Sequence, residues 1–101
     1  FAKDHLGYTA LHLSCEEGNL SVVHIMIDST PDIDEPNKFG ETPIHLAAHN
    51  GHIAAMLALL DPELAIVPAD TTITDASGRT LLMKACMSGH IDLVHLLLKT
   101  R

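Results

Sequence analysis

A fifteen-residue pattern occurs three times in this 101-residue chain and constrains its fold more than any other feature. The clearest copy, at 37–51, reads N-K-F-G-E-T-P-I-H-L-A-A-H-N-G, and related copies occupy 4–18 and 75–89. All six glycines fall at two positions of the pattern, and a threonine follows the first glycine by two residues in every copy. A pattern that recurs along the chain in this way is typical of proteins built by stacking similar units.

Each copy predicts a tight turn followed by two short helices. The first glycine permits a positive φ, the threonine can cap the next helix, and the second glycine can end that helix. In the middle copy Pro43 stands at the first helical position, where its missing N–H costs nothing. We expect helices over about 10–17, 20–28, 53–60 and 91–99, and two more after the caps Thr42 and Thr80.

The spacing of the copies divides the chain into three repeats within one domain, 1–101. Repeat 1 covers about 4–36, repeat 2 about 37–74 and repeat 3 about 75–101. Repeat 2 carries a five-residue insertion within 61–74, where Asp61-Pro62-Glu63 is typical of a helix start and predicts one extra helical turn at 64–67. Two interpretations of this insertion remain open: a tolerated surface loop held by its own apolar residues, or an exposed apolar docking element.

The charge and hydropathy of the chain exclude several classes of partner. A net charge of −7 argues against nucleic acid and anionic lipid, which both require a basic surface. The longest apolar run, 53–60, is far shorter than the ~20 residues that span a bilayer. An acidic cluster is best explained as a solvated connector, with a cation site as the alternative, and comprises Asp28, Asp32, Asp34 and Glu35. We expect no nucleic-acid or membrane partner.

The two cysteines occupy equivalent places in their repeats. Cys15, Ala48 and Cys86 align, so cysteine is expected to replace a small buried alanine. Positions two repeats apart exceed the ~7 Å between Cα atoms that a disulfide tolerates. Free thiols and the absence of a secretory signal predict an intracellular setting, in the cytoplasm or the nucleus. A redox or metal sensor that uses these thiols is the alternative.

The eight histidines also follow the repeat. His12 and His45 share one repeat position, and His52 and His90 share another. A structural role therefore explains all four histidines better than a metal-binding or acid–base role. His45 and His49 have the spacing of a zinc pair, but the glutamate of H-E-x-x-H is missing. No phosphate-binding loop, nucleophile elbow or paired acid motif is present. We therefore expect no catalytic residue, metal or cofactor.

The motif D-x-x-G-x-T-P-L-H-x-A-A-x-x-G-H, most complete at 37–52, resembles the ankyrin repeat, whose period is about 33 residues. The resemblance covers residues 2–101 and implies an all-α solenoid of stacked antiparallel helix pairs with projecting hairpin-like loops. It implies that His12 and His45 hydrogen-bond the preceding threonine and nearby backbone, whereas Met83 replaces this histidine in the third repeat. Residues 2–4 resemble a joint between repeats, and the apolar helix at 91–99 is atypical of a terminal unit, so we expect a segment of a longer chain.

The resemblance further implies a non-catalytic module that binds a protein or peptide on its loop tips and on the concave face of its inner helices. The face consists of the residues that are left after the turn, cap and core residues are removed. It includes Ala76 and Ser77 of the third loop. The residues of this face that are expected to contact the partner are His5, Leu6, Tyr8, Glu16, Glu17, Lys38, Phe39, Glu41, His49, Asn50, Arg79, Lys84, Met87 and Ser88.

Two features of that face suggest how it recognises a partner. The aromatic residues Tyr8 and Phe39 stand at turn positions, where they can anchor an interface or instead stiffen the row of loops. Charge is graded along the face and could orient a partner segment or simply be solvated; the residues concerned are Glu16, Glu17, Arg79 and Lys84. Two other roles remain open: a regulatory or substrate-recruiting domain of a larger enzyme, and a structural spacer between flanking repeats or domains.

Overall fold

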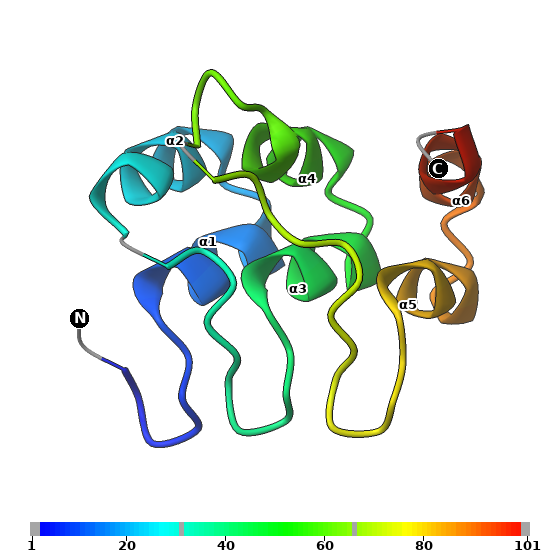
Figure 1. Cartoon of the computed structure of the whole chain (residues 1–101), viewed down its shortest axis with the longest axis horizontal. Coiled ribbons are helices and arrows are strands. Elements are labelled where there is room, and N and C mark those ends of the chain that lie inside the picture. Colours follow the sequence, from blue (N-terminus) through cyan, green and yellow to red (C-terminus); the bar gives the residue numbers. More distant parts are fainter. Residues whose placement is uncertain (1–2, 31, 66, 100–101) are drawn as a thin grey trace.

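Three pairs of antiparallel helices form two layers in the computed structural model, which describes residues 3–30, 32–65 and 67–99. The inner helices α1, α3 and α5 stack in one row, and α2 packs against α4 in a second layer, which is drawn above them in Figure 1. Three loops project from the same edge. The bounds are α1 Ala10–Glu17, α2 Leu20–Ser29, α3 Pro43–His49, α4 Ile53–Leu60, α5 Leu81–Met87 and α6 Ile91–Lys99. The predicted all-helical class is confirmed, and none of these helices is long and apolar enough to cross a bilayer.

Local capping explains where the helices begin. The Thr9 hydroxyl accepts a hydrogen bond from the His12 amide at 3.3 Å, and the Thr80 hydroxyl accepts one from the Met83 amide at 3.2 Å. These bonds satisfy amide groups that have no partner within the helix. The predicted bounds of the first, fourth and sixth helices, α1, α4 and α6, are confirmed, because the caps and the glycine breaks lie within the sequence of each unit.

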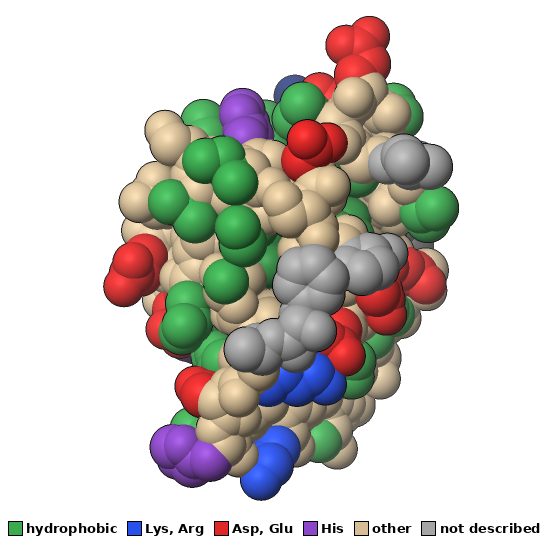
Figure 2. All heavy atoms as spheres, turned by 90° about the vertical axis from the view of Figure 1, so that its left-hand side faces the viewer, with side chains coloured by type: hydrophobic (Ala, Val, Ile, Leu, Met, Phe, Trp, Pro, Cys, Tyr) green, Lys and Arg blue, Asp and Glu red, His purple; other side chains and the backbone are tan. Residues whose placement is uncertain are grey.

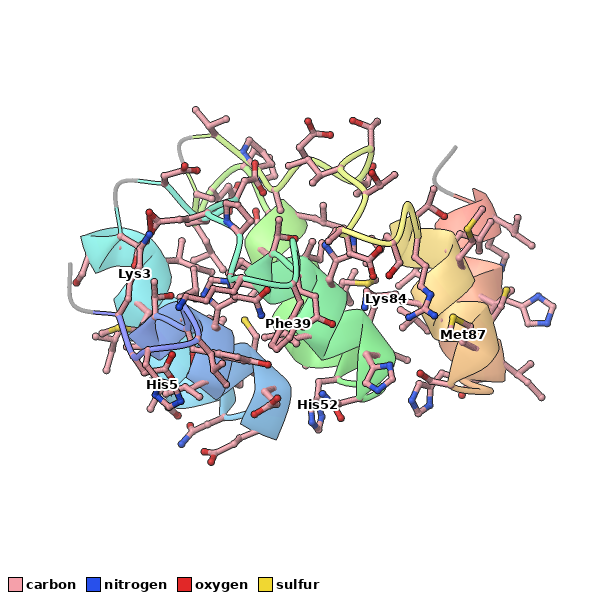
Figure 3. All side chains as sticks on the ribbon, turned by 90° about the horizontal axis from the view of Figure 1, so that it is seen from below. Lys3, His5, Phe39, His52, Lys84 and Met87 are labelled. Atoms are coloured by element: carbon pink, nitrogen blue, oxygen red, sulfur yellow. The ribbon has the colours of Figure 1, made fainter. Side chains whose placement is uncertain are left out.

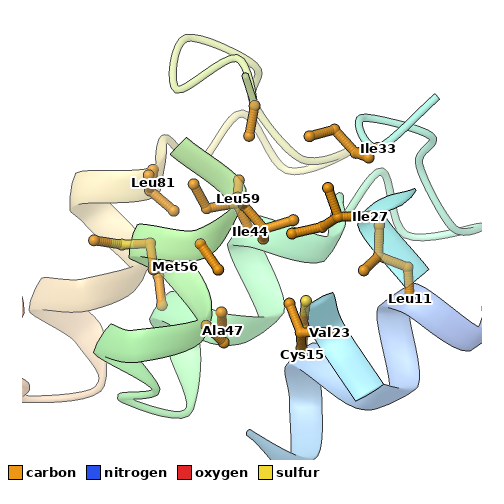
Figure 4. Packing of buried hydrophobic residues seen from close by; sticks show 14 of the residues in the cluster. Leu11, Cys15, Val23, Ile27, Ile33, Ile44, Ala47, Met56, Leu59 and Leu81 are labelled. Carbon is orange, nitrogen blue, oxygen red and sulfur yellow. The ribbon is translucent and has the colours of Figure 1, made fainter. Parts of the chain in front are cut away.

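The core lies between the two layers and continues from one repeat into the next. Leu11, Val23, Ile44, Met56 and Leu59 are fully buried there, as Figure 4 shows for the contact region of the first two repeats. Burying a side chain of this size contributes roughly 1.5–3 kcal/mol to folding. Stability therefore combines packing within each helix pair with packing between neighbouring units, as in other repeat proteins.

One cysteine departs from the expected burial. Cys15 and Ala48 are completely buried, but Cys86 is exposed, so the expectation of a buried third position was wrong. The inner helices α1 and α3 are each followed by another inner helix, α3 and α5 respectively, whereas no further inner helix follows α5 in the described part of the chain. Burial at this position depends on the next unit rather than on the helix itself.

The insertion forms a turn at 62–64 instead of the helical turn predicted at 64–67, of which Ile66 lies outside the described residues. The Ala65 amide donates to the Asp61 carbonyl at 2.9 Å, which closes the turn. Pro68 disfavours helical conformation at Val67, so the turn does not propagate. Ala65 and Ala69 are buried against the core, and this anchors the insertion with its own apolar residues.

Candidate functional site

Main-chain hydrogen bonds join the three projecting loops into one row. The Lys38 amide donates to the Leu6 carbonyl, and the Ala76 amide donates to the Phe39 carbonyl, both at 2.9 Å. Each bond connects the tip of one loop to the tip of the next, as the parallel course of the loops in Figure 1 illustrates. The loop tips from repeats 1, 2 and 3 therefore form a continuous and rigid edge.

The first residue of each loop closes that loop from within. The Asp4 carboxylate accepts from the Leu6 and Tyr8 amides at 2.9 Å. Asn37 and Asp75 do the same at the equivalent positions, at 2.9 to 3.0 Å. Loop closure by these three residues was not among the sequence predictions, although short polar side chains that recur at one turn position are typical of such closure.

The loop tips carry adjacent apolar side chains. Phe39 is 50% exposed at the tip of the second loop, and Leu6 occupies the equivalent place on the first. Figure 3 looks onto this edge and shows Phe39 between the first loop, which bears His5, and the third repeat. The exposed side chains of His5 and Lys38 adjoin these two residues in the chain. The structure thus brings the expected loop residues together around an exposed aromatic ring.

Tyr8 behaves differently from Phe39. Its ring is half-buried and lies edge-on against the imidazole of His12, with the ring centres 5.7 Å apart. Burial, followed by the nearby charge of Glu41, raises the pKa of the Tyr8 hydroxyl. Tyr8 therefore packs within its own repeat, and Phe39 is left as the exposed aromatic of the loops.

The ends of the inner helices supply a second row of the expected residues. Glu17 and Met87 are exposed at the ends of α1 and α5, whereas Glu16 is half-buried. The exposed His49 and the half-buried Ser88 hydrogen-bond each other through Nδ1 and Oγ at 2.9 Å. The exposed Asn50 side chain donates to a backbone carbonyl of its own helix at 2.9 Å, so three of these side chains are already engaged.

Lys84 is buried, and its expected place on the exposed face was wrong. Its ammonium lies 2.8 Å from the Glu41 carboxylate and 3.1 Å from that of Asp75. Burial alone would raise the pKa of both carboxyl groups, but hydrogen bonds, including those from Lys84, outweigh it and lower both pKa values. Glu41 is consequently half-buried and paired, and Arg79 remains as the exposed base of the expected gradient. The gradient is therefore weaker than the sequence predicted.

The histidines that follow the capping threonines play the expected structural role. The His12 Nδ1 accepts from the Thr9 amide at 3.1 Å, and its Nε2 lies 3.0 Å from the Glu41 carbonyl in the next repeat. The His45 Nδ1 accepts from the Thr42 amide at 3.2 Å. Both predictions are confirmed.

The histidines after the second glycine also connect neighbouring repeats. The His52 Nε2 lies 3.1 Å from the Glu16 carbonyl, and the His90 Nε2 lies 3.0 Å from the His49 carbonyl. Within 3–30, 32–65 and 67–99, no three His, Cys, Asp or Glu side chains are grouped closely enough to hold a metal ion. The imidazoles thus act as hydrogen-bonding links between units.

The stability of the protein is expected to fall as the pH decreases from 7 to 5. Burial lowers the pKa of His12 and His45 from the ordinary value of 6.5, because it disfavours the charged imidazole. The folded state therefore binds fewer protons than the unfolded chain. The stability that these two imidazoles contribute is present above pH 6.5 and is lost as the pH falls below this value. Urea unfolding at pH 7.5 and 5.5 measures this loss.

Matched variants assign this loss to the buried imidazoles. A His12→Gln and His45→Gln double variant should lose most of the pH dependence. A double variant at the exposed His24 and His95, also to Gln, should keep it. Equal pH dependence in both double variants would contradict the assignment.

Comparison with known proteins agrees with this architecture. A family model described as three copies of the ankyrin repeat matches residues 1–66, and a single ankyrin-repeat model matches 77–101. BCL-6 corepressor-like protein 1 of Homo sapiens is 31% identical over 94 residues, which cover 89% of this chain and 5% of that protein. The NF-kappa-B inhibitor cactus of Drosophila melanogaster is 34% identical over 96 residues, which cover 94% of this chain and 17% of that protein.

The B-cell lymphoma 3 protein homolog of Mus musculus is 34% identical over 101 residues, which cover 96% of this chain and 22% of that protein. The chain thus spans between 5% and 22% of the length of these three relatives. The chain belongs to the ankyrin-repeat family.

Proposed function

We propose that this chain is a non-catalytic module that binds another protein or a peptide segment through its loop tips and the concave ends of its inner helices. Ankyrin repeats are in general protein-interaction modules. The observation that carries the proposal here is the exposed Phe39 ring, held on a loop that is hydrogen-bonded to both of its neighbours. Aromatic anchors contribute disproportionately to binding energy, and a rigid support reduces the entropy lost on binding.

Exposed polar and charged side chains surround this anchor. His5 and Lys38 lie on the first two loops, Arg79 on the third, and Glu17 at the end of α1. A polar rim around an apolar centre is the usual composition of a protein-binding surface. We infer that Phe39 and Leu6 provide affinity and that the rim governs the rate and orientation of association.

The names of two relatives support a protein partner. One is named as an inhibitor of NF-kappa-B and the other as a corepressor-like protein, names that describe action on other proteins. We infer a cytoplasmic or nuclear setting for this chain from its free cysteines. Because the chain covers a small share of each relative, a regulatory or substrate-recruiting role within a larger enzyme is a second candidate.

A spacer role is the third candidate, and one surface favours it. The first helix pair exposes Leu13, Leu20 and Ile25, and Figure 2 shows hydrophobic side chains gathered over this end of the stack. Such a surface could pack against further residues of a longer chain. The loop tips, in contrast, are not covered by any described segment, which favours the binding role.

The Phe39→Ala substitution is expected to weaken partner binding by about thirtyfold, as for loss of an interface hot spot, without changing the helical circular-dichroism signal. Leu57→Ala is the matched control, because Leu57 is 46% exposed on the outer helix α4. The measurement is affinity capture with the wild-type chain and each variant, followed by quantitative mass spectrometry. Equal retention of every captured protein by all three baits would contradict the proposal.

A further inference from the structure

A groove of about 410 Å³ lies between the C-terminal end of α2, the connector that follows it and the insertion of repeat 2. Figure 1 shows the insertion above α2 and α4, at the edge of the molecule opposite to the three loops. The volume falls within the roughly 300–1,000 Å³ typical of ligand sites. A partner bound to the loop tips would therefore leave this groove accessible.

The floor and one wall of the groove are apolar. Ile27, Ile33 and Ala65 are buried at its base. On the insertion, Leu64 is 39% exposed and Val67 is 72% exposed. A long apolar side chain that is left this open gains free energy when a ligand covers it. The wall is thus suited to an aliphatic group.

The opposite rim of the groove is acidic. Asp28 and Asp32 are exposed, and Asp34 is half-buried, where its carboxylate accepts from the Asp70 amide at 3.1 Å. Burial, together with the charges of Asp32 and Asp70, raises the pKa of Asp34 despite that hydrogen bond. No lysine, arginine or histidine is among the lining residues, so this negative charge has no basic neighbour in the groove.

We propose that the groove docks a short peptide segment of a partner protein, in which aliphatic side chains alternate with lysine or arginine. The aliphatic groups would cover Leu64 and Val67, and the cationic groups would pair with the carboxylates of Asp28 and Asp32. Charge-assisted hydrogen bonds of this kind are short and strong. This second site is independent of the proposed loop face.

An inorganic cation alone would not match both the acidic and the apolar residues of the groove. The acidic side chains of the groove do not form a group of three that could hold a metal ion, within the described parts of the chain. An inorganic ion would also leave the apolar wall uncovered. The combination of apolar floor and acidic rim therefore selects a cationic and aliphatic peptide over a metal ion.

The first test locates the binding site of a defined probe, the synthetic peptide acetyl-Lys-Leu-Arg-Leu-Lys-amide. It is titrated into the isotope-labelled chain, and amide chemical shifts are followed by nuclear magnetic resonance. We expect the shifts to concentrate at 27–34 and 64–70, with 38–39 unaffected. Shifts centred on the loops, shifts spread over all acidic surfaces, or no shift at millimolar peptide would each overturn the proposal.

The second test uses variants at exposed positions, which the fold should tolerate. Leu64→Ser with Val67→Ser, and Asp28→Asn with Asp32→Asn, should each weaken probe binding about tenfold. The charge control is Asp92→Asn, which removes an exposed negative charge on α6, away from both proposed sites, and should leave affinity unchanged. Equal weakening by the control would show general attraction to an acidic protein and overturn the proposal.

A further pair of measurements keeps this site separate from the loop face. Phe39→Ala should leave probe binding unchanged, because the ring lies on the loops and does not line the groove. A probe that replaces both leucines with serine should bind about tenfold more weakly if the apolar wall contributes. Undiminished binding of the serine probe would contradict the assigned role of Leu64 and Val67.

Discussion

The Lys84→Ala substitution is expected to lower the free energy of unfolding by about 3 kcal/mol. Lys84 is 4% exposed and is shared by Glu41 and Asp75, which come from the second and third loops. Removing it would leave two carboxylates close together with no positive partner, and it would also remove the buried methylene chain. Urea unfolding monitored by circular dichroism at neutral pH measures the loss.

A neutral triple variant separates charge from packing. Lys84→Met with Glu41→Gln and Asp75→Asn removes all three charges and should recover most of the lost stability, since well-packed neutral groups commonly replace a buried ion network without cost. Asparagine is a suitable replacement at position 75, because Asn37 already closes the equivalent loop in repeat 2. If Lys84→Ala were as stable as the wild type, the network would not be holding the loops together.

The Gly40→Ala substitution is expected to cost about 3 kcal/mol, and Gly78→Ala only about 1 kcal/mol. Both glycines have a positive φ, of 74° and 78° respectively, so an alanine is strained equally at either position. A Cβ at Gly40 would also overlap the backbone nitrogen of Ala76 and lie 2.9 Å from the carbonyl carbon of Asp75, whereas a Cβ at Gly78 would meet nothing within 4 Å.

The difference between these two variants isolates the packing of one loop against the next. It should appear in the free energy of unfolding, and it should be accompanied by faster hydrogen exchange of the Ala76 amide, which donates to the Phe39 carbonyl. Similar losses for Gly40→Ala and Gly78→Ala would mean that backbone strain alone governs both positions and that the loops are not closely packed.

Most of the helical framework could be predicted from the sequence because its determinants are local. Thr9, Thr42 and Thr80 mark the helix starts, and the glycines after the first helices mark their ends. The hydrogen bonds of His12 and His45 were implied by the resemblance to the ankyrin repeat, and in the structure each histidine bonds to a threonine three residues away.

The features that the sequence did not predict depend on contacts between repeats. Lys84 occupies the repeat position of the buried Leu46 and of the exposed Leu13, so the repeat did not determine its burial, and its carboxylate partners come from two different loops. Cys86 is exposed because no further inner helix of the described chain packs beside α5. The contact of Tyr8 with His12 is an exception, because both residues belong to repeat 1. The groove arises from the path of the insertion over α2, which helix propensity does not determine.

Site-specific photo-cross-linking in cells tests whether the loop tips bind a partner. A benzophenone amino acid is placed at position 39 on the loop tips, and in a separate variant at position 57 on the outer helix, which is similarly exposed. We expect the cross-linker at position 39 to capture a discrete partner protein and the one at position 57 to capture none. Partner capture at position 57 with none at position 39 would contradict recognition through the loops.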